Sequence, residues 1–157
     1  SKRILDSYLY EDEDFLYNFN LTFQINPEIF NQIPNQFALS FFQERIIADF
    51  EIRVIYIDGL FYSVAIHTFD KTIDYRTKLI TMENLRMIPF TLPTPIEEKL
   101  RNVFQKFNLN YGSADLMYSN NEYYFLEINP TGQISFVNNA CNFYLENILS
   151  KKLKDGK

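Results

Sequence analysis

The chain has 157 residues, of which 46% are hydrophobic, and a formal net charge of −5. This length and apolar content suit a packed core and exclude a disordered chain, while the acidic balance argues against a general nucleic-acid binder. No apolar run approaches the roughly 20 residues that span a membrane, and the single Cys141 cannot form an intramolecular disulfide. We therefore expect a cytoplasmic protein with no membrane and no nucleic-acid partner.

The first part of the chain predicts short elements. Residues 3–9 and 21–25 have strand-like patterns. A short helix is expected to begin at Asn26, whose side chain can cap it, and to end before Pro34. Residues 37–47 are apolar and aromatic, which predicts a buried strand with a polar interruption.

A β-hairpin is the clearest element of the middle of the chain. Residues 51–57 and 60–68 are rich in β-branched and aromatic side chains and flank Asp58-Gly59. Asp-Gly between two such runs is a strong signal for a hairpin turn. Residues 69–93 contain no clear periodicity and are predicted to be irregular.

The last third predicts two helices and a second hairpin. A helix is expected to begin after a Thr94 cap. Its apolar face would consist of Ile96, Leu100, Val103, Phe104 and Phe107. A hairpin of residues 113–119 and 122–128 is expected to turn at residues 120–121, and residues 138–153 predict an amphipathic helix. The fold class is therefore α+β, a mainly antiparallel sheet flanked by helices.

The second predicted hairpin contains candidate metal-binding residues. Glu127 and Asn129 are two residues apart and so point to one face of their strand. With the expected turn, residues 113–115 lie opposite residues 126–128, and Asp115 comes near both side chains. Carboxylate and amide oxygens are hard ligands that suit magnesium. Acidic residues on a half-exposed strand also commonly face water, so spacing alone leaves both interpretations open.

Residues 111–118 and 124–133 resemble the final hairpin of ATP-grasp ligases. In that family an Asp on one strand and a Glu-x-Asn on the next hold the magnesium ions that bridge the ATP phosphates. The resemblance thus implies ATP as cofactor and Asp115, Glu127 and Asn129 as ligands of two magnesium ions.

The ending of the hairpin narrows the resemblance. Asn-Pro-Thr-Gly-Gln at residues 129–133 is similar to the microviridin-type ribosomal-peptide ligases, or graspetide synthetases. Cys-Asn-Phe-Tyr-Leu-Glu at residues 141–146 resembles the start of a helix in the peptide maturases of grasp-with-spasm systems, the nearest likeness within that group.

The likeness extends upstream. Residues 42–46 resemble the interdomain strand whose backbone meets the adenine, and Lys2 matches a lid lysine that contacts phosphates. The residues that the resemblance assigns to ATP are Lys2, Gln43, Glu44 and Ile46. Two acidic-x-Arg motifs imply that Arg53 and Arg76 clamp phosphate or acyl phosphate, which suits the fork of the guanidinium group.

The resemblance covers about residues 37–150. It implies that residues 37–157 form a C-terminal ATP-grasp catalytic domain and that residues 1–36 are a remnant of the central, lid-bearing subdomain. The chain opens without Met, and an N-terminal domain and a complete lid are not present as a whole. We therefore expect a C-terminal piece of a longer ligase.

The implied reaction modifies a ribosomal precursor peptide, recognised through its leader. ATP would phosphorylate a side-chain carboxylate, and a hydroxyl or amine of the same peptide would attack the acyl phosphate to form an ester or amide crosslink. Two alternatives stay open: a ligase for free amino acids or small acids, of the glutamate-ligase or glutathione-synthetase type, and a non-enzymatic peptide-binding remnant. The oligomeric state is also open, with a homodimer among the alternatives.

Overall fold

The computed structural model describes residues 2–3, 22, 24–36, 40–69, 73 and 84–155. The chain divides into two compact units: Ser1–Arg45 with Phe69–Asn84, and Ile46–Thr68 with Leu85–Lys157. Within the described residues, no helix is both long and apolar enough to cross a membrane.

Among its described residues, the first unit contains three short elements. Strand β1 (Lys2–Arg3) pairs with β2 (Ser40–Phe41) in an antiparallel manner. Helix α1 (Pro27–Gln32) confirms the predicted short helix, because the Asn26 side chain accepts the N–H of Ile29 at 2.8 Å.

Two strand predictions in the first unit are wrong where the structure describes them. Within residues 40–47, the part of the predicted strand that the structure describes, only Ser40–Phe41 lie in a strand, and residues 42–48 have no regular secondary structure. The side chain of Phe42 is 49% exposed rather than buried. Residues 22, 24 and 25 are also irregular. An apolar run becomes a strand only where it finds a pairing partner, and here the pairing with β1 stops at Phe41.

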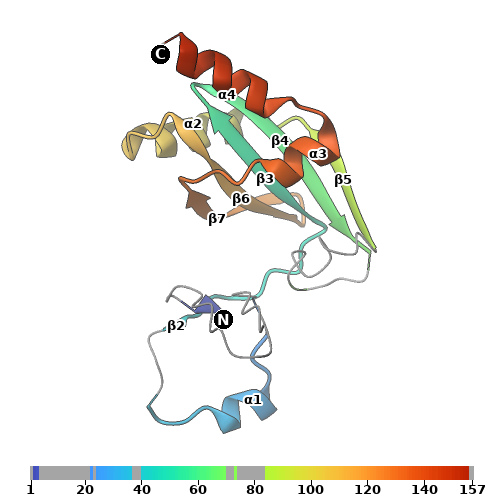
Figure 1. The fold of residues 1–157 in the computed structure, drawn as a ribbon. Helices are drawn as coiled ribbons and strands as arrows, with labels where there is room; N and C mark the ends of the chain where they lie inside the picture. The colour runs from blue at the N-terminus through green and yellow to red at the C-terminus, as the bar shows by residue number, and fades with distance from the viewer. Residues whose placement is uncertain are drawn as a thin grey trace, which may run out of the picture. The chain divides into compact units, whose positions relative to one another are not determined.

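The second unit is built on a five-stranded antiparallel sheet with the order β5-β4-β3-β6-β7 (Figure 1). Its strands are β3 (Phe50–Ile57), β4 (Leu60–Thr68), β5 (Leu85–Phe90), β6 (Tyr111–Ser119) and β7 (Glu122–Asn129). Both predicted hairpins are confirmed. The prediction of an irregular stretch over 69–93 is wrong at β5, whose Pro89 is tolerated because β5 is an edge strand.

The two hairpins turn where the sequence places them because their turn residues tolerate a left-handed backbone. Asp58 and Gly59 have φ of 46° and 89°, and Asn120 and Asn121 have φ of 51° and 65°. Positive φ at both central residues matches the right-handed twist of the flanking strands.

Helix α2 (Thr94–Lys106) covers one face of the sheet. Its Leu100 and Phe104 are buried in the main core, and the Phe104 ring stacks on Tyr56 at 4.4 Å between centroids. Other core members are Ile52, Val54, Leu92, Ala114 and Leu116. The predicted Thr94 cap is wrong, since Pro93 occupies the cap position without a side-chain hydrogen bond. Phe107 is 65% exposed because it follows the last helical residue.

Helices α3 (Ser135–Cys141) and α4 (Leu145–Lys154) lie on the other side of the sheet (Figure 1). The predicted single helix over 138–153 is therefore wrong. The backbone breaks it at Asn142 and Tyr144, which have φ of 54° and 55°. The Asn138 side chain bridges the break by accepting the N–H of Leu145 at 2.8 Å.

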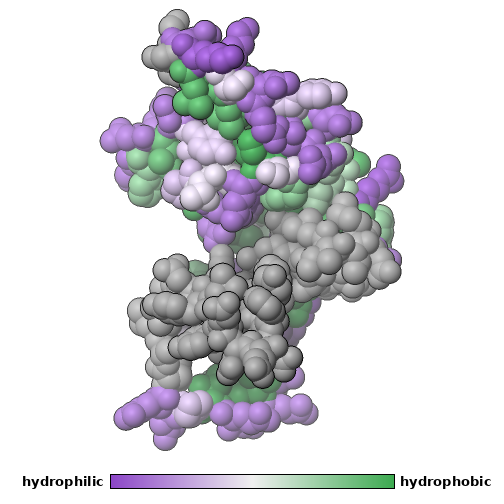
Figure 2. Space-filling view, viewed as in Figure 1, coloured by the Kyte–Doolittle hydropathy of each residue, from purple (hydrophilic) through white to green (hydrophobic). Residues whose placement is uncertain are grey.

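The α4 helix is amphipathic, as the sequence predicts. Leu145 is fully buried, and hydrophilic residues gather over the C-terminal end of the helix (Figure 2). The helices on both faces of the antiparallel sheet confirm the predicted α+β class.

Candidate active site

Three neighbouring strands present polar side chains on the face opposite the α2 core. Arg53 in β3 lies directly opposite Asp115 in β6, and Asp115 lies directly opposite Glu127 in β7. Asn129 lies two residues further along β7, opposite Ser113. Because strand side chains alternate, these groups share one face, and directly opposed pairs have Cβ atoms about 4.5–5.5 Å apart.

The pairing of β6 and β7 corrects the predicted register by one residue. Residues 113–115 lie opposite 127–129, not opposite 126–128. The cause is a β-bulge between Asp115 and Leu116, beyond which Leu116 pairs with Phe125. A regular register would have placed Glu127 opposite Ala114, which belongs to the α2 core. The bulge instead brings Glu127 to Asp115.

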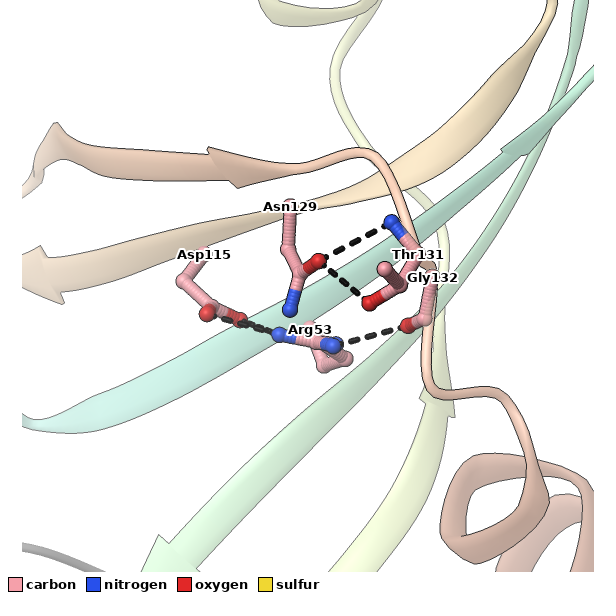
Figure 3. Close-up of polar contacts among 5 residues, drawn as sticks. All are labelled: Arg53, Asp115, Asn129, Thr131 and Gly132. Carbon is pink, nitrogen blue, oxygen red and sulfur yellow. Dashed lines mark hydrogen bonds and ion pairs between the residues drawn. The ribbon is translucent and has the colours of Figure 1, made fainter. Parts of the chain in front are cut away.

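Arg53 is the buried centre of this face. Its side chain is 4% exposed and its Nη1 donates to both carboxylate oxygens of Asp115, at 2.8 and 2.7 Å (Figure 3). Its Nη2 donates to the carbonyl oxygen of Gly132 at 2.8 Å, and the guanidinium lies 5.7 Å from the centre of the Phe136 ring. The Nε atom is buried without a hydrogen-bond partner. Arg53 thus joins Asp115 to the turn that follows β7.

That turn also holds Asn129. The Asn129 Oδ1 atom accepts the backbone N–H of Thr131 at 3.0 Å and the Thr131 hydroxyl at 2.6 Å (Figure 3). An amide oxygen has two lone pairs, so Thr131 uses both of them.

Gly132 is required at its place in the turn. It has φ of 76°, and a Cβ there would lie 2.3 Å from the hydroxyl oxygen of Tyr111. Burial raises the pKa of Tyr111, with the positive Arg53 acting in the opposite direction. The glycine therefore allows Tyr111 to pack on the turn while the Gly132 carbonyl faces Arg53.

The donor set fits a magnesium ion at its two carboxylates. Asp115 and Glu127 offer hard oxygens on adjacent strands, and a carboxylate has about four acceptor sites, so the hydrogen bonds from Arg53 do not by themselves exclude a cation. Asn129 fits only after the Thr131 hydroxyl turns away from its oxygen. Across the described ranges, no three His, Cys, Asp or Glu side chains gather to hold a metal, so an all-protein cage of these residue types is not formed there.

The structure brings Arg53, Asp115, Glu127 and Asn129 together, as described above. Of the other residues predicted to contact ATP, Lys2, Gln43 and Glu44 belong to the first unit and Ile46 to the second. Lys2 lies in β1 opposite Phe41, Gln43 and Glu44 are exposed in the irregular segment 42–48, and Ile46 is half-buried. Arg76 lies outside the described residues.

Sequence reasoning missed the roles of Thr131, Gly132 and Phe136. A usable signal existed for Thr131, because an Asn side chain that accepts the backbone N–H two residues on is a common turn motif. The run Asn-Pro-Thr-Gly has the composition of such a turn. No local pattern points to the contacts of Gly132 and Phe136 with Arg53, since 79 residues separate Arg53 from Gly132.

No protein-family model matches the chain, and no curated protein sequence does. Among solved structures, the chain is similar to a RiPP-associated ATP-grasp ligase of Chryseobacterium gregarium in complex with ADP and a leader and core peptide. The identity is 25% and the TM-score is 0.55, over 62% of this chain and 30% of the ligase.

Two further similar structures are complexes with a precursor peptide or a precursor variant. The ATP-grasp ligase PsnB, complexed with a phosphomimetic variant of its minimal precursor, Mg and ADP, is 18% identical with a TM-score of 0.50, over 62% of this chain and 30% of PsnB. The macrocyclase MdnC of Microcystis aeruginosa MRC, bound with the precursor peptide MdnA, is 28% identical with a TM-score of 0.45, over 59% of this chain and 26% of MdnC.

The resemblance expected from the sequence is thereby confirmed: this chain is similar to RiPP-associated ATP-grasp ligases. It spans about 30% of the length of the Chryseobacterium ligase.

Proposed function

We propose that the chain is the C-terminal catalytic part of an ATP-dependent peptide ligase that crosslinks a ribosomal precursor peptide. In this proposal residues 37–157 form the catalytic domain, and residues 1–36 derive from the central subdomain. The proposal rests on one observation: the fold is similar to that of a ligase with bound ADP and peptide, and it presents a polar face of Arg53, Asp115, Glu127 and Asn129.

Charge neutralisation is the main task of this face. Asp115 and Glu127 would hold magnesium, with Asn129 as a further ligand, and two such ions would supply positive charge that offsets the charge developing on the phosphoryl oxygens. Arg53 is buried and directs both terminal nitrogens to protein atoms. We therefore assign Arg53 to holding Asp115 in place, and the phosphate clamp to Arg76.

The reaction proceeds in two steps. A peptide carboxylate oxygen attacks the γ-phosphorus of ATP, the bond to the β–γ bridging oxygen breaks, and ADP leaves. A peptide hydroxyl or amine then attacks the carbonyl carbon of the acyl phosphate, loses its proton, and expels inorganic phosphate. Positioning and electrostatic stabilisation together supply most of the rate gain in such transfers, and no nucleophile of the enzyme is needed.

The test uses the full-length protein with Mg²⁺, ATP and a precursor peptide encoded beside its gene. We expect the peptide to lose the mass of one water per crosslink, and hydroxylamine to trap the acyl phosphate as a hydroxamate. Glu127→Ala should abolish both products, while Glu98→Ala on the exposed side of α2 should leave them unchanged. ATP hydrolysis without a change in peptide mass would contradict crosslinking and favour a ligase for small acids.

A further inference from the structure

Thr131 donates both of its hydrogen bonds to Oδ1 of Asn129, the atom that is predicted to bind the metal. Its backbone N–H and its hydroxyl both donate to Oδ1 of Asn129, at 3.0 and 2.6 Å, and these two donors use the two lone pairs of that oxygen. A cation can bind the same oxygen only if one donor leaves. The hydroxyl can leave by rotation about one side-chain bond, whereas the N–H is fixed by the turn.

The surrounding contacts show which parts of the turn are fixed. Gly132, the next residue, accepts from the buried Arg53 through its carbonyl and packs against Tyr111. The N–H of Gly132 donates to the carbonyl oxygen of Asn129 at 3.2 Å, which closes the turn. The Thr131 side chain itself is exposed and makes its hydrogen bond at the surface. The backbone is thus held on both sides of a side chain that has room to move.

We infer that Thr131 is a positioning residue. Its hydroxyl holds the Asn129 carboxamide in place, and it releases a lone pair of Asn129 Oδ1 when a divalent cation binds. This inference rests on the proposed function, because it takes Asn129 as a metal ligand. The backbone N–H of Thr131 keeps Oδ1 aimed at the site in both states, and the hydroxyl competes with the cation for the remaining lone pair.

Competition and simple structural support make opposite predictions for one isosteric change. Thr131→Val removes the hydroxyl but keeps the β-branched shape and the backbone N–H. If the hydroxyl competes, the variant binds the cation more tightly, by roughly three- to tenfold, the range expected from loss of one neutral hydrogen bond. If the hydroxyl only supports the turn, binding weakens or stays the same.

The experiment titrates Mn²⁺ into the full-length protein with saturating ADP and measures free Mn²⁺ by electron paramagnetic resonance. Glu127→Ala supplies the baseline for Mn²⁺ held by ADP alone, and Thr131→Ser retains the hydroxyl as the matched control. Tighter binding in Thr131→Val, with Thr131→Ser close to the wild type, supports the inference.

The remaining outcomes separate the inference from the proposed function. Mn²⁺ binding that Glu127→Ala abolishes but Thr131→Val leaves unchanged or weakens overturns the role of Thr131 and leaves the metal site standing. Wild-type binding no stronger than the Glu127→Ala baseline overturns the metal site, and the role of Thr131 with it. As a second readout, the Mg²⁺ concentration for half-maximal ATP turnover should fall in Thr131→Val.

Discussion

Arg53 ties Asp115 to the carbonyl oxygen of Gly132 through one guanidinium group. The family resemblance of the acidic-x-Arg motif at residues 51–53 led to the prediction that this arginine clamps phosphate. The sequence could not show that the side chain is buried and directed at Asp115, since the two residues are 62 positions apart. Their pairing depends on the order of the strands, which no local pattern encodes.

Replacing Arg53 by Met should destabilise the protein strongly. The change leaves the Asp115 carboxylate without its paired charge in a largely buried place, and removal of one partner of a buried pair costs about 3 kcal/mol or more. Urea unfolding followed by circular dichroism measures the loss. Arg86→Met, at an exposed position in β5, is the control and should change stability by about 0.5 kcal/mol or less. Equal losses in the two variants would contradict the role assigned to Arg53.

Two glycines with positive φ provide a matched pair for testing the close packing of the turn. Gly132→Ala and Gly59→Ala both pay for a left-handed backbone, about 1 kcal/mol each. Only Gly132→Ala also forces Tyr111 to move, because the new Cβ would lie 2.3 Å from its hydroxyl oxygen, whereas at Gly59 the nearest atom is 3.5 Å away. Gly132→Ala should therefore lower the urea midpoint more. A larger loss from Gly59→Ala would mean that Tyr111 does not pack there.

The two hairpin turns could be predicted from their own residues, but the boundary between α3 and α4 could not. Asp58-Gly59 and Asn120-Asn121 favour positive φ, so both turns could be read locally. The single helix predicted over 138–153 is instead two helices, because the apolar spacing continues through the break at Asn142 and Tyr144. What allows the break is a capping contact from Asn138, which periodicity does not reveal.

Loss of the Asn138 cap should destabilise α4. Asn138→Ala removes the acceptor of the Leu145 N–H, and the loss of such a cap costs about 1 kcal/mol. Asn138→Asp keeps an acceptor and should restore most of the stability. The neighbouring exposed Asn139→Ala serves as the control, with thermal unfolding as the measurement. If Asn138→Ala and Asn139→Ala lower the midpoint equally, the cap does not hold α4.

At the scale of the whole molecule, the α+β class could be predicted because alternating and helical patterns are spread along the chain. The strand β5 was missed, since Pro89 and a short apolar run are also typical of loops and only its place at the sheet edge makes the strand stable. The placement of Arg53 beside Asp115 depends on the order of the strands. Only the approach of Asp115 to Glu127 and Asn129 could be predicted, because these three residues belong to one hairpin.

Stability should fall as the pH rises through the alkaline range. Burial raises the pKa of Tyr111, Tyr123 and Cys141, and the hydrogen bond to Asp58 raises the pKa of Lys152. Each group holds its proton more tightly when folded, so the folded state binds more protons and loses stability once the pH passes the ordinary values of 9.0 to 10.5.

The urea midpoint measured from pH 8 to pH 10.5 checks this prediction. It should be nearly constant at the start of the range and then decline. The double variant Tyr123→Phe with Cys141→Ser removes two of the responsible groups and should make the decline shallower. A midpoint that rises with pH would contradict the assignment.

The bulge at Asp115/Leu116 makes chain length, and not only chain composition, part of the site. Deleting Leu126 would restore an unbroken ladder with Glu127 still opposite Asp115 and Asn129 still opposite Ser113, so both side chains would keep their face. Inserting one further residue between Phe125 and Glu127 without a second bulge would instead place Glu127 opposite Ala114 and turn Glu127 and Asn129 towards α2. Relatives of this chain that lack one residue here should therefore keep the chemistry, whereas relatives with one added residue need a second bulge to keep it, a distinction that motif matching alone does not make.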